Sequence, residues 1–383
     1  MQPQGSNKAG TLNIRSAAQP LQLEVGNLTP PPLFVKSQSQ APSPKALLRM
    51  PNRLVIVVIS AISLLSACTT LRFSGNENTT PTTGTQDFHD AEANVRAAGE
   101  KFTELHGDYL GQPLPGETPV VFASGIVSMD YKEHWAPRFS PDGNEVFWWT
   151  IRVDEENNWH EIHKTMKRIG DRWRVPETSP YDNAPVFSPD GKRLYFGSKK
   201  EGDDLSFVEK QGDSWSEPKS VGLVTRFPVV RFAYFPTITS NGTLYFMGYL
   251  EGQWASIGIY RSELINGEYA NPELLPPSIN TLGGTRNWTP FIAPDESYLI
   301  FCSTRGLPAS DQGDLFISFR QPDGNWTEPV NLGEPINSKG LDRFPAVSPD
   351  GKYLFFTQST PDHDEDVFWV SAKIIEKLRE ASH

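Results

Sequence analysis

The segment WHEIH, residues 159–163, carries two histidines that could bind zinc. Zinc proteases place two such histidines four residues apart, so that both lie on one face of a helix. His160 and His163 are only three residues apart and lie in a predicted strand, where they point to opposite faces. The spacing argues against a metal site, and we predict none.

The acidic run PDHDED, residues 361–366, could hold a hard cation through its carboxylate oxygens. It lacks the glycine of an EF-hand loop and falls between two predicted strands. Because runs of charge are usually solvated, we expect a hairpin loop that faces water.

Hydrolase chemistry is an alternative that the residues leave open. The segments QGDSWSEP and PDGNWTEP are similar to the Asp-box of sialidases, which is a turn motif and not a catalytic one. A sialidase also needs arginines for the substrate carboxylate and a tyrosine nucleophile. The candidates for these roles are Arg226, Arg231, Arg286 and Tyr234. The sequence contains no GxSxG elbow, no Gly-rich phosphate loop and no pair of CxxC motifs.

The elements that must position these residues come from a repeated unit. Each unit has a short strand, a tight turn such as Ser-Pro-Asp-Gly, and a strand of alternating apolar residues. A third strand follows, and then a fourth strand after an aromatic residue and a proline. Four antiparallel strands per unit predict a propeller blade. The leading prolines, spaced by 48, 51, 54 and 55 residues, are Pro137, Pro185, Pro236, Pro290 and Pro345.

The fifth unit has no fourth strand, because only a short charged tail, residues 372–383, follows its third. Residues 117–128 have the character of a fourth strand without the first three. Ile126 stands seven residues after a proline there, as Ile279 and Ile336 do in complete units. We predict an all-β fold, a single propeller over residues 117–371 with five four-stranded antiparallel blades, closed by this N-terminal strand.

The Ser-Pro-Asp-Gly hairpins and the fourth strands of the type NWTEPVNLGEPIN resemble the TolB-like, WD-repeat-like propeller repeats of bacterial envelope proteins. The resemblance covers residues 117–371, with local departures at residues 240–242 (SNG) and at Asp295-Glu296, where the glycine is missing. It implies the propeller fold and says little about chemistry. Such repeats occur in translocation proteins, in peptidases as an accessory domain, and in many lipoproteins.

Asp190, in the hairpin FSPDGKRLYFGS, recurs as Asp142 and Asp350 and is replaced by Asn241 in the third unit. Asp and Asn both bond back to the backbone of a tight turn, whereas acid–base catalysis does not tolerate the exchange. We therefore predict that Asp190 shapes a turn.

The residues just before each leading proline enter the innermost strand, so we expect them to ring one mouth of the central channel. Charged and aromatic side chains on converging loops suit recognition of a ligand or peptide. A ring that bonds only to itself and to water is the structural alternative. The ligand-binding candidates are His134, Trp135, Asp182, Arg231, Tyr234, Arg286, Trp288 and Asp342, and their ring neighbours include Asn183, Asn287 and Arg343. We predict no catalytic residue, metal or cofactor.

The N-terminal region predicts export. The apolar run of residues 54–67 follows a basic flank and is too short to span a bilayer comfortably. Leu65-Ser66-Ala67-Cys68 resembles the bacterial lipobox, at which a signal peptidase cuts and the cysteine is lipidated. The alternative is an uncleaved anchor in which Cys68 is incidental.

These features divide the N-terminal part of the chain. The expected segments are a disordered or untranslated extension over residues 1–49, a lipoprotein signal peptide over 50–67, a flexible tether over 68–87, and a short helix with its lead-in over 88–116. Thr69 after the cysteine, by resemblance, implies sorting to the outer membrane of a Gram-negative cell.

The charge of the body excludes one class of partner. The chain has a net charge of -11, and residues 1–67 carry six basic residues and one Glu, so the remainder carries -16. An acidic body repels phosphates, so we do not expect nucleic acid as a partner.

Our first functional hypothesis is a non-catalytic envelope lipoprotein that binds a protein, peptide or glycan. It would be lipid-anchored at the periplasmic face of the outer membrane or at the cell surface. The alternative is a carbohydrate-active or peptide-cleaving hydrolase that works at the channel mouth.

The lipobox interpretation predicts the mass of the mature protein. We expect intact-mass measurement on protein extracted from its own membranes to show a chain that starts at Cys68 and carries added lipid. A mature chain that retains residues before Cys68 would contradict this interpretation.

Overall fold

The computed structural model describes residues 103–129, 132–154, 156–183, 185–198, 204–227, 230–249, 257–281, 285–307, 313–360 and 363–381. All of these residues belong to one compact unit, residues 92–383. The predicted N-terminal extension, signal peptide, tether and lipid site lie outside the described residues, as does most of the predicted N-terminal helix. No helix in the described part of the chain is long and apolar enough to cross a membrane.

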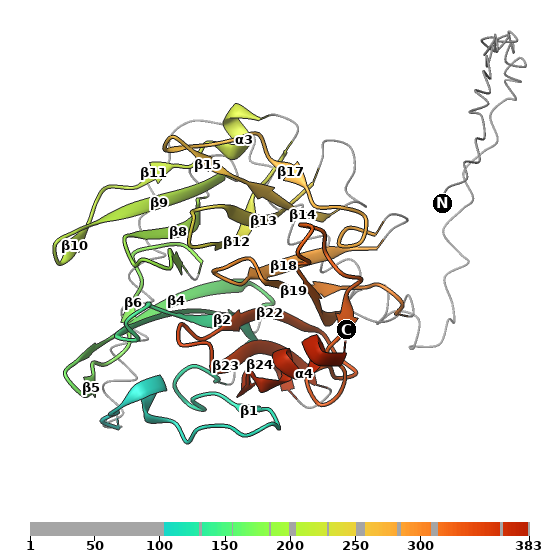
Figure 1. Ribbon diagram of the computed structural model, residues 1–383. Coiled ribbons are helices and arrows are strands. Elements are labelled where there is room, and N and C mark those ends of the chain that lie inside the picture. Colours follow the sequence, from blue (N-terminus) through green and yellow to red (C-terminus); the bar gives the residue numbers. More distant parts are fainter. Residues whose placement is uncertain are drawn as a thin grey trace, which may run out of the picture. The chain divides into compact units, whose positions relative to one another are not determined.

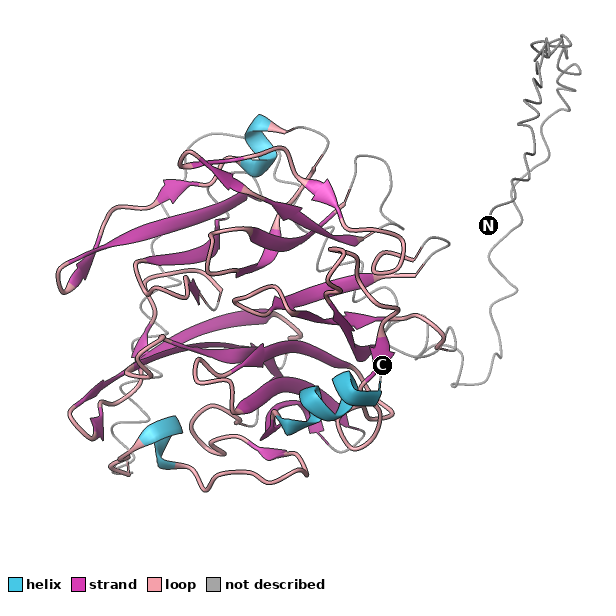
Figure 2. Cartoon of the chain, viewed as in Figure 1, coloured by secondary structure: helices cyan, strands magenta, loops and turns pink. Residues whose placement is uncertain are grey.

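Five antiparallel sheets follow one another along the chain as the predicted blades, and Figure 2 draws their strands in magenta. Blade 1 consists of β2 (Lys132–Phe139), β3 (Glu145–Val153), β4 (Trp159–Ile169) and β6 (Glu177–Thr178). Blade 2 consists of β7 (Val186–Phe187), β8 (Arg193–Ser198), β9 (Asp204–Gln211) and β11 (Lys219–Ser220). Blade 3 consists of β12 (Tyr234–Ile238), β13 (Leu244–Gly248), β14 (Gly258–Ser262) and β17 (Glu273–Leu274).

The last two blades have the same order of strands. Blade 4 consists of β18 (Asn287–Ile292), β19 (Tyr298–Ser303), β20 (Asp314–Phe319) and β21 (Val330–Asn331). Blade 5 consists of β22 (Asp342–Val347), β23 (Tyr353–Thr360), β24 (His363–Ser371) and β1 (Val120–Val121). The first strands of neighbouring blades contact one another all the way round, from β2 through β7, β12, β18 and β22 back to β2. They are the innermost strands and surround the channel.

Short strands and helices lie between or beside the blade strands. Between the third and fourth strands, hairpins are extended by β5 (Arg172–Trp173), β10 (Ser214–Trp215), β15 (Leu264–Ile265) and β16 (Glu268–Tyr269). The helical elements are η1 (Asp108–Gly111), α3 (Leu223–Arg226) and α4 (Lys373–Ala381). Residues 372–383 are more than the predicted charged tail, because the apolar residues of α4 pack against the propeller and Ile375 is buried.

The ring closes as predicted, because the N-terminal strand β1 completes the last blade. Val120 pairs with Trp369 and Val121 with Phe368, in antiparallel register. In Figure 1 the teal β1 lies beside the red β24, which comes from the other end of the propeller sequence. Closure gives blade 5 four strands, the same number as in the other blades.

A buried polar side chain anchors the loop after the fourth strand in several blades. In blade 4, Asn337 accepts a hydrogen bond from the backbone N–H of Leu315 at 2.8 Å and donates one to its carbonyl at 3.0 Å. In blade 5, Ser128 makes the same pair of bonds with Val367, at 3.1 and 3.3 Å. The anchor fixes where the chain turns inward toward the next innermost strand.

The anchors also correct the alignment of the closing strand. Ile279 and Ile336, which precede the anchoring asparagines, are fully buried, and the buried residue before Ser128 is Val127. Ile126, which the seven-residue spacing had aligned with these isoleucines, is only half-buried. The pattern is therefore shifted by one residue in blade 5.

The Ser-Pro-Asp-Gly aspartates shape turns, as predicted. Asp190 Oδ1 accepts hydrogen bonds from the Ser188 hydroxyl at 2.7 Å and from the Lys192 backbone at 3.0 Å. Asn241 takes the equivalent bonds in blade 3. Glu296, which stands in place of the glycine, adopts the glycine's left-handed conformation with φ of 60°.

The acidic run at residues 361–366 departs from the predicted solvated loop. The strand β24 begins at His363, which pairs with Thr360, so the last acidic residues belong to a sheet. Glu365 is only 4% exposed and accepts hydrogen bonds from Arg343 of β22. A buried counter-charge makes this carboxylate compatible with the interior.

Phe122, just after β1, tests whether the N-terminal strand holds the ring together. Its ring lies 5.1 Å from both Phe355 and Trp369 and is fully buried. We expect Phe122→Ala to lower the free energy of unfolding by about 3–5 kcal/mol in urea denaturation. The neighbouring Val121→Ala, at an exposed side chain, should cost less than about 1 kcal/mol. Equal effects of the two variants would contradict an integral role for this strand.

Candidate functional site

The innermost strands begin at the channel mouth with an unusual backbone. Phe235, Thr289 and Phe344 each precede a leading proline and have φ values of 55°, 48° and 54°. Each sits at a break in the strand register, which is a β-bulge. Non-glycine residues rarely adopt this conformation, so the packing around them must hold it in place.

An aromatic plug, formed by Trp135, Phe235 and Phe344, closes the channel below this mouth. The ring centroid of Phe235 lies 4.8 Å from that of Trp135 and 5.2 Å from that of Phe344. Trp135 and Phe344 are stacked at 5.4 Å. Phe235 belongs to blade 3, which is not adjacent to blade 1 or blade 5, so these contacts run across the channel.

A chain of polar groups joins blades 1 and 5 beside the plug. Arg343 donates two hydrogen bonds to Glu365, at 2.8 and 2.7 Å, and a third to Nδ1 of His134 at 3.0 Å. Thr357 also donates to Glu365, at 2.6 Å. Burial, reinforced by the charge of Arg343, holds the pKa of His134 well below its ordinary value. His134 is therefore a neutral acceptor at pH 7, oriented by Arg343.

A second cluster lies at the mouth between blades 3 and 4. The guanidinium of Arg286 lies 5.1 Å from the ring centroid of Trp288. Trp288 is half-buried and packs against an apolar cluster of Phe232, Met247 and Tyr249. The rings of Phe232 and Tyr249 are 4.4 Å apart. Together these five side chains form what we call the Arg–aromatic patch.

The remaining predicted residues lie in different settings. Tyr234 is half-buried and packs on Phe232, at the edge of the patch. Arg231 and Asp182 are exposed on loops that lead to their innermost strands. Asp342 is fully buried, and its carboxylate accepts hydrogen bonds from Ser338 and Gln358, at 2.7 and 3.0 Å. Burial raises the pKa of Asp342 to about 7.

Glu133 is a fully buried carboxyl group whose Oε2 atom has no hydrogen-bond partner. Its Oε1 accepts hydrogen bonds from the Met129 backbone at 3.1 Å and from the Thr150 hydroxyl at 3.4 Å. Burial raises the pKa of Glu133 to about 9, and the nearby carboxyl group of Asp366 adds to the effect. Glu133 is therefore protonated at pH 7.

The two histidines of WHEIH and Arg226, which the sequence offered for metal binding or catalysis, make structural contacts instead. His160 lies 2.7 Å from Asp154, whereas His163 stacks on Trp149, so the two histidines have separate partners. Arg226 donates hydrogen bonds to the backbone carbonyls of Val221, Tyr269 and Gly222 and braces α3. Among the described residues, no group of three metal-ligating side chains is placed to hold an ion.

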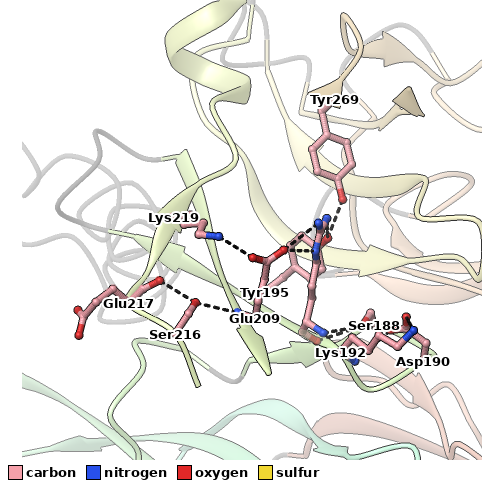
Figure 3. A network of polar contacts seen from close by, with 10 residues as sticks. Ser188, Asp190, Lys192, Tyr195, Glu209, Ser216, Glu217, Lys219 and Tyr269 are labelled. Atoms are coloured by element: carbon pink, nitrogen blue, oxygen red, sulfur yellow. Dashed lines mark hydrogen bonds and ion pairs between the residues drawn. The ribbon is translucent and has the colours of Figure 1, made fainter. Parts of the chain in front are cut away.

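A groove of about 460 Å³ lies between blades 2 and 3, at the end of the hairpin turns. Glu209, which lines the groove, accepts hydrogen bonds from Lys219 at 2.5 Å and from Arg193 at 3.0 Å, so its charge is paired within the chain. Figure 3 shows Glu209 pointing toward Lys219, with the Tyr195 and Tyr269 hydroxyls meeting nearby at 2.9 Å. The network is satisfied without a ligand.

Several side chains at the mouth were not among the residues predicted from the sequence. Phe235 and Phe344 each stand directly before a leading proline, which was a usable signal for side chains that enter the channel. Glu365 was assigned to a loop because its neighbours are acidic. Side chains in a strand alternate between the two faces of the sheet, so this alternation in β24 would have shown which of its acidic side chains point inward.

The comparisons with known proteins add little beyond the fold. No protein-family model matches the sequence, and no curated protein matches it. The chain is similar to an endo-arabinase from Bacteroides thetaiotaomicron, with 14% identity, 68% of this chain and 97% of that chain covered, and a TM-score of 0.42. It is also similar to a protein of unknown function from Dyadobacter fermentans, with 12% identity, 69% and 85% covered, and a TM-score of 0.40. A GH62 α-L-arabinofuranosidase catalytic domain from Coprinopsis cinerea has 8% identity, 67% and 97% covered, and a TM-score of 0.38.

The protonated state of Glu133 predicts a specific pH dependence. In the unfolded chain Glu133 ionises near pH 4.5, but in the folded chain it keeps its proton to about pH 9. The folded state binds more protons between these values, so this group's contribution to stability is lost as the pH rises through that window. Glu133→Gln mimics the protonated acid, so its stability relative to the original chain should rise with pH, by at most about 1.4 kcal/mol per unit.

Urea denaturation between pH 5 and pH 9 measures this difference. Glu365→Gln is the control, because it leaves Arg343 buried without its counter-charge and should destabilise the protein throughout the range. A stability difference between Glu133→Gln and the original chain that stays constant with pH would show that Glu133 is ionised in the folded state.

Proposed function

We propose that this chain is a non-catalytic binding propeller of the bacterial cell envelope. In this proposal a lipid on Cys68 anchors it to a membrane, and a partner binds at the channel mouth. The observation that carries the proposal is the Arg–aromatic patch, where Arg286 covers Trp288 beside a cluster of aromatic side chains. The lipobox-like segment at residues 65–68 supports the envelope location.

The composition of the patch suits protein recognition. Arginine, tryptophan and tyrosine dominate the binding energy of protein interfaces, because they combine large apolar area with directional polar groups. The stacking on Trp288 positions Arg286, and no carboxylate of the described residues forms an ion pair with it. A basic group on an acidic body favours an acidic segment of a partner protein over a neutral glycan.

The form of the channel supports binding over catalysis. The aromatic plug fills the space where substrate would meet the innermost strands. Glycoside cleavage needs two carboxyl groups on either side of an accessible bond. Of the acidic residues near the mouth, Asp342 and Glu133 are fully buried, Glu365 is engaged by Arg343, and Asp182 alone among these four is exposed.

A hydrolase is the second candidate function, and one observation favours it. Glu133 has a raised pKa and a second carboxyl group, Asp366, beside it, which is how enzymes keep a general acid protonated. Because Glu133 is fully buried, a substrate could reach it only if the residues that cover it moved away. The binding proposal needs no such movement.

Capture of envelope proteins on the immobilised chain tests the proposal. We expect Arg286→Ala and Trp288→Ala to reduce capture of the main partner by about tenfold or more. Arg320→Ala is the matched control, because Arg320 stacks on Trp326 at 5.0 Å in the same blade but away from the mouth. Capture should also weaken as salt is raised, since the contact is between unlike charges.

Equal capture by Arg286→Ala, Arg320→Ala and the original chain would remove the patch as the binding surface. Turnover of aryl glycosides or peptides by the original chain, with loss of turnover in Glu133→Gln, would replace the binding proposal by the hydrolase.

A further inference from the structure

The half of the channel beyond the plug contains a cavity of about 320 Å³, to which all five blades contribute. Its walls are mostly apolar, with hydroxyl groups from Ser188, Thr237 and Ser348. The exposed prolines of the hairpin turns, Pro141, Pro294 and Pro349 among them, border it, so it reaches the surface at the end opposite the mouth. A cavity of this size suits a small organic molecule.

Among the described residues, Arg138 is the one charged side chain that lines this cavity. It follows the leading proline of blade 1, where the other four blades have Val186, Thr237, Phe291 and Ala346. A guanidinium thus occupies a position that the repeat otherwise fills with apolar or small side chains. The exception is visible in the sequence alone.

The guanidinium of Arg138 is buried without a counter-charge. The side chain is 8% exposed, and it donates one long hydrogen bond, at 3.3 Å, to the carbonyl of Pro345. Its Nε atom has no hydrogen-bond partner, and no carboxylate in the described part of the chain pairs with it. Its other contact is the Trp135 ring, 5.6 Å away.

Such an arrangement costs stability in the empty protein. A buried charge without a partner is unfavourable because it has lost its water, and an apolar residue of similar size would avoid that cost. Burial lowers the pKa of Arg138 to about 9, which still leaves it charged at pH 7. A permanent cation that faces an open cavity is instead suited to hold an anion that enters from outside.

We propose that this cavity binds a small monocarboxylate with an apolar body, whose carboxylate pairs with Arg138. The planar guanidinium matches a carboxylate, which can accept two parallel hydrogen bonds from it. The side chains of Phe187, Ile238, Phe291 and Phe355 line the space that the apolar body would fill. These walls disfavour a strongly hydrated inorganic anion such as phosphate, which would have to lose its water without compensation.

This site is independent of the proposed function, because the plug separates the cavity from the mouth. Substitutions at Arg138 should leave partner capture unchanged, and Arg286→Ala should leave carboxylate binding unchanged. Failure of one proposal is therefore distinguishable from failure of the other.

Calorimetric titration of the purified protein with benzoate tests the site. Benzamide, of the same shape without the charge, is the first comparison, and inorganic phosphate and chloride are the second. We expect benzoate to bind, benzamide and phosphate to bind at least about tenfold more weakly, and Arg138→Met to weaken benzoate by about tenfold or more. Arg138→Lys keeps the charge but not the planar fork, so its loss should be smaller.

Two further variants keep the test decisive if Arg138→Met fails to fold. Ala346→Leu narrows the cavity without touching Arg138 and should also weaken benzoate. Arg193→Met, in the groove between blades 2 and 3, is the matched control and should leave the affinity within about twofold. No binding of benzoate to the original chain overturns the proposal. So does binding that Arg138→Met leaves unchanged, or binding of chloride or phosphate as tight as that of benzoate.

Discussion

The pairing of β1 with β24 is the contact on which the rest of the structure depends. It converts five sheets into a closed ring in which every innermost strand has a neighbour on both sides. A ring of only five blades has a narrow channel, so side chains from blades that are not adjacent can meet across it. That is why Trp135, Phe235 and Phe344 touch, and why the channel is divided into a mouth and a cavity.

The interior accommodates buried charge in three different ways. Arg343 and Glu365 neutralise each other directly, with His134 as a further acceptor. Glu133 avoids the free-energy cost of a buried charge, because it keeps its proton beside Asp366. Arg138 does neither, because it keeps its charge and no carboxylate of the described residues pairs with it; its contacts are a carbonyl oxygen and the Trp135 ring. The contrast marks Arg138 as the residue whose environment is incomplete within the chain itself.

The sequence predicted the fold well, because the fold rests on local signals. The Asp190 turn, the leading proline of each unit and the proline before the fourth strand are short-range features, and they placed the blades and their closure correctly. The mouth was predicted less completely, since the direction of each side chain depends on bulges. No short sequence pattern shows that Phe235 and Phe344 take positive φ. Nor does one show that the side chain of Asp342 is fully buried. Arg138 could have been found by aligning the repeats.

Closure also has a consequence for how the chain reaches this state. Ser128 and Val367, which bond to each other in the last blade, are 239 residues apart in the sequence. Contacts of such high sequence separation form slowly, because a long loop must close before they contribute. Blades 1 to 4 can assemble from consecutive residues, but blade 5 has to wait until β24 has been synthesised. Until then β1 cannot pair with β24, so the growing chain carries an unpaired strand.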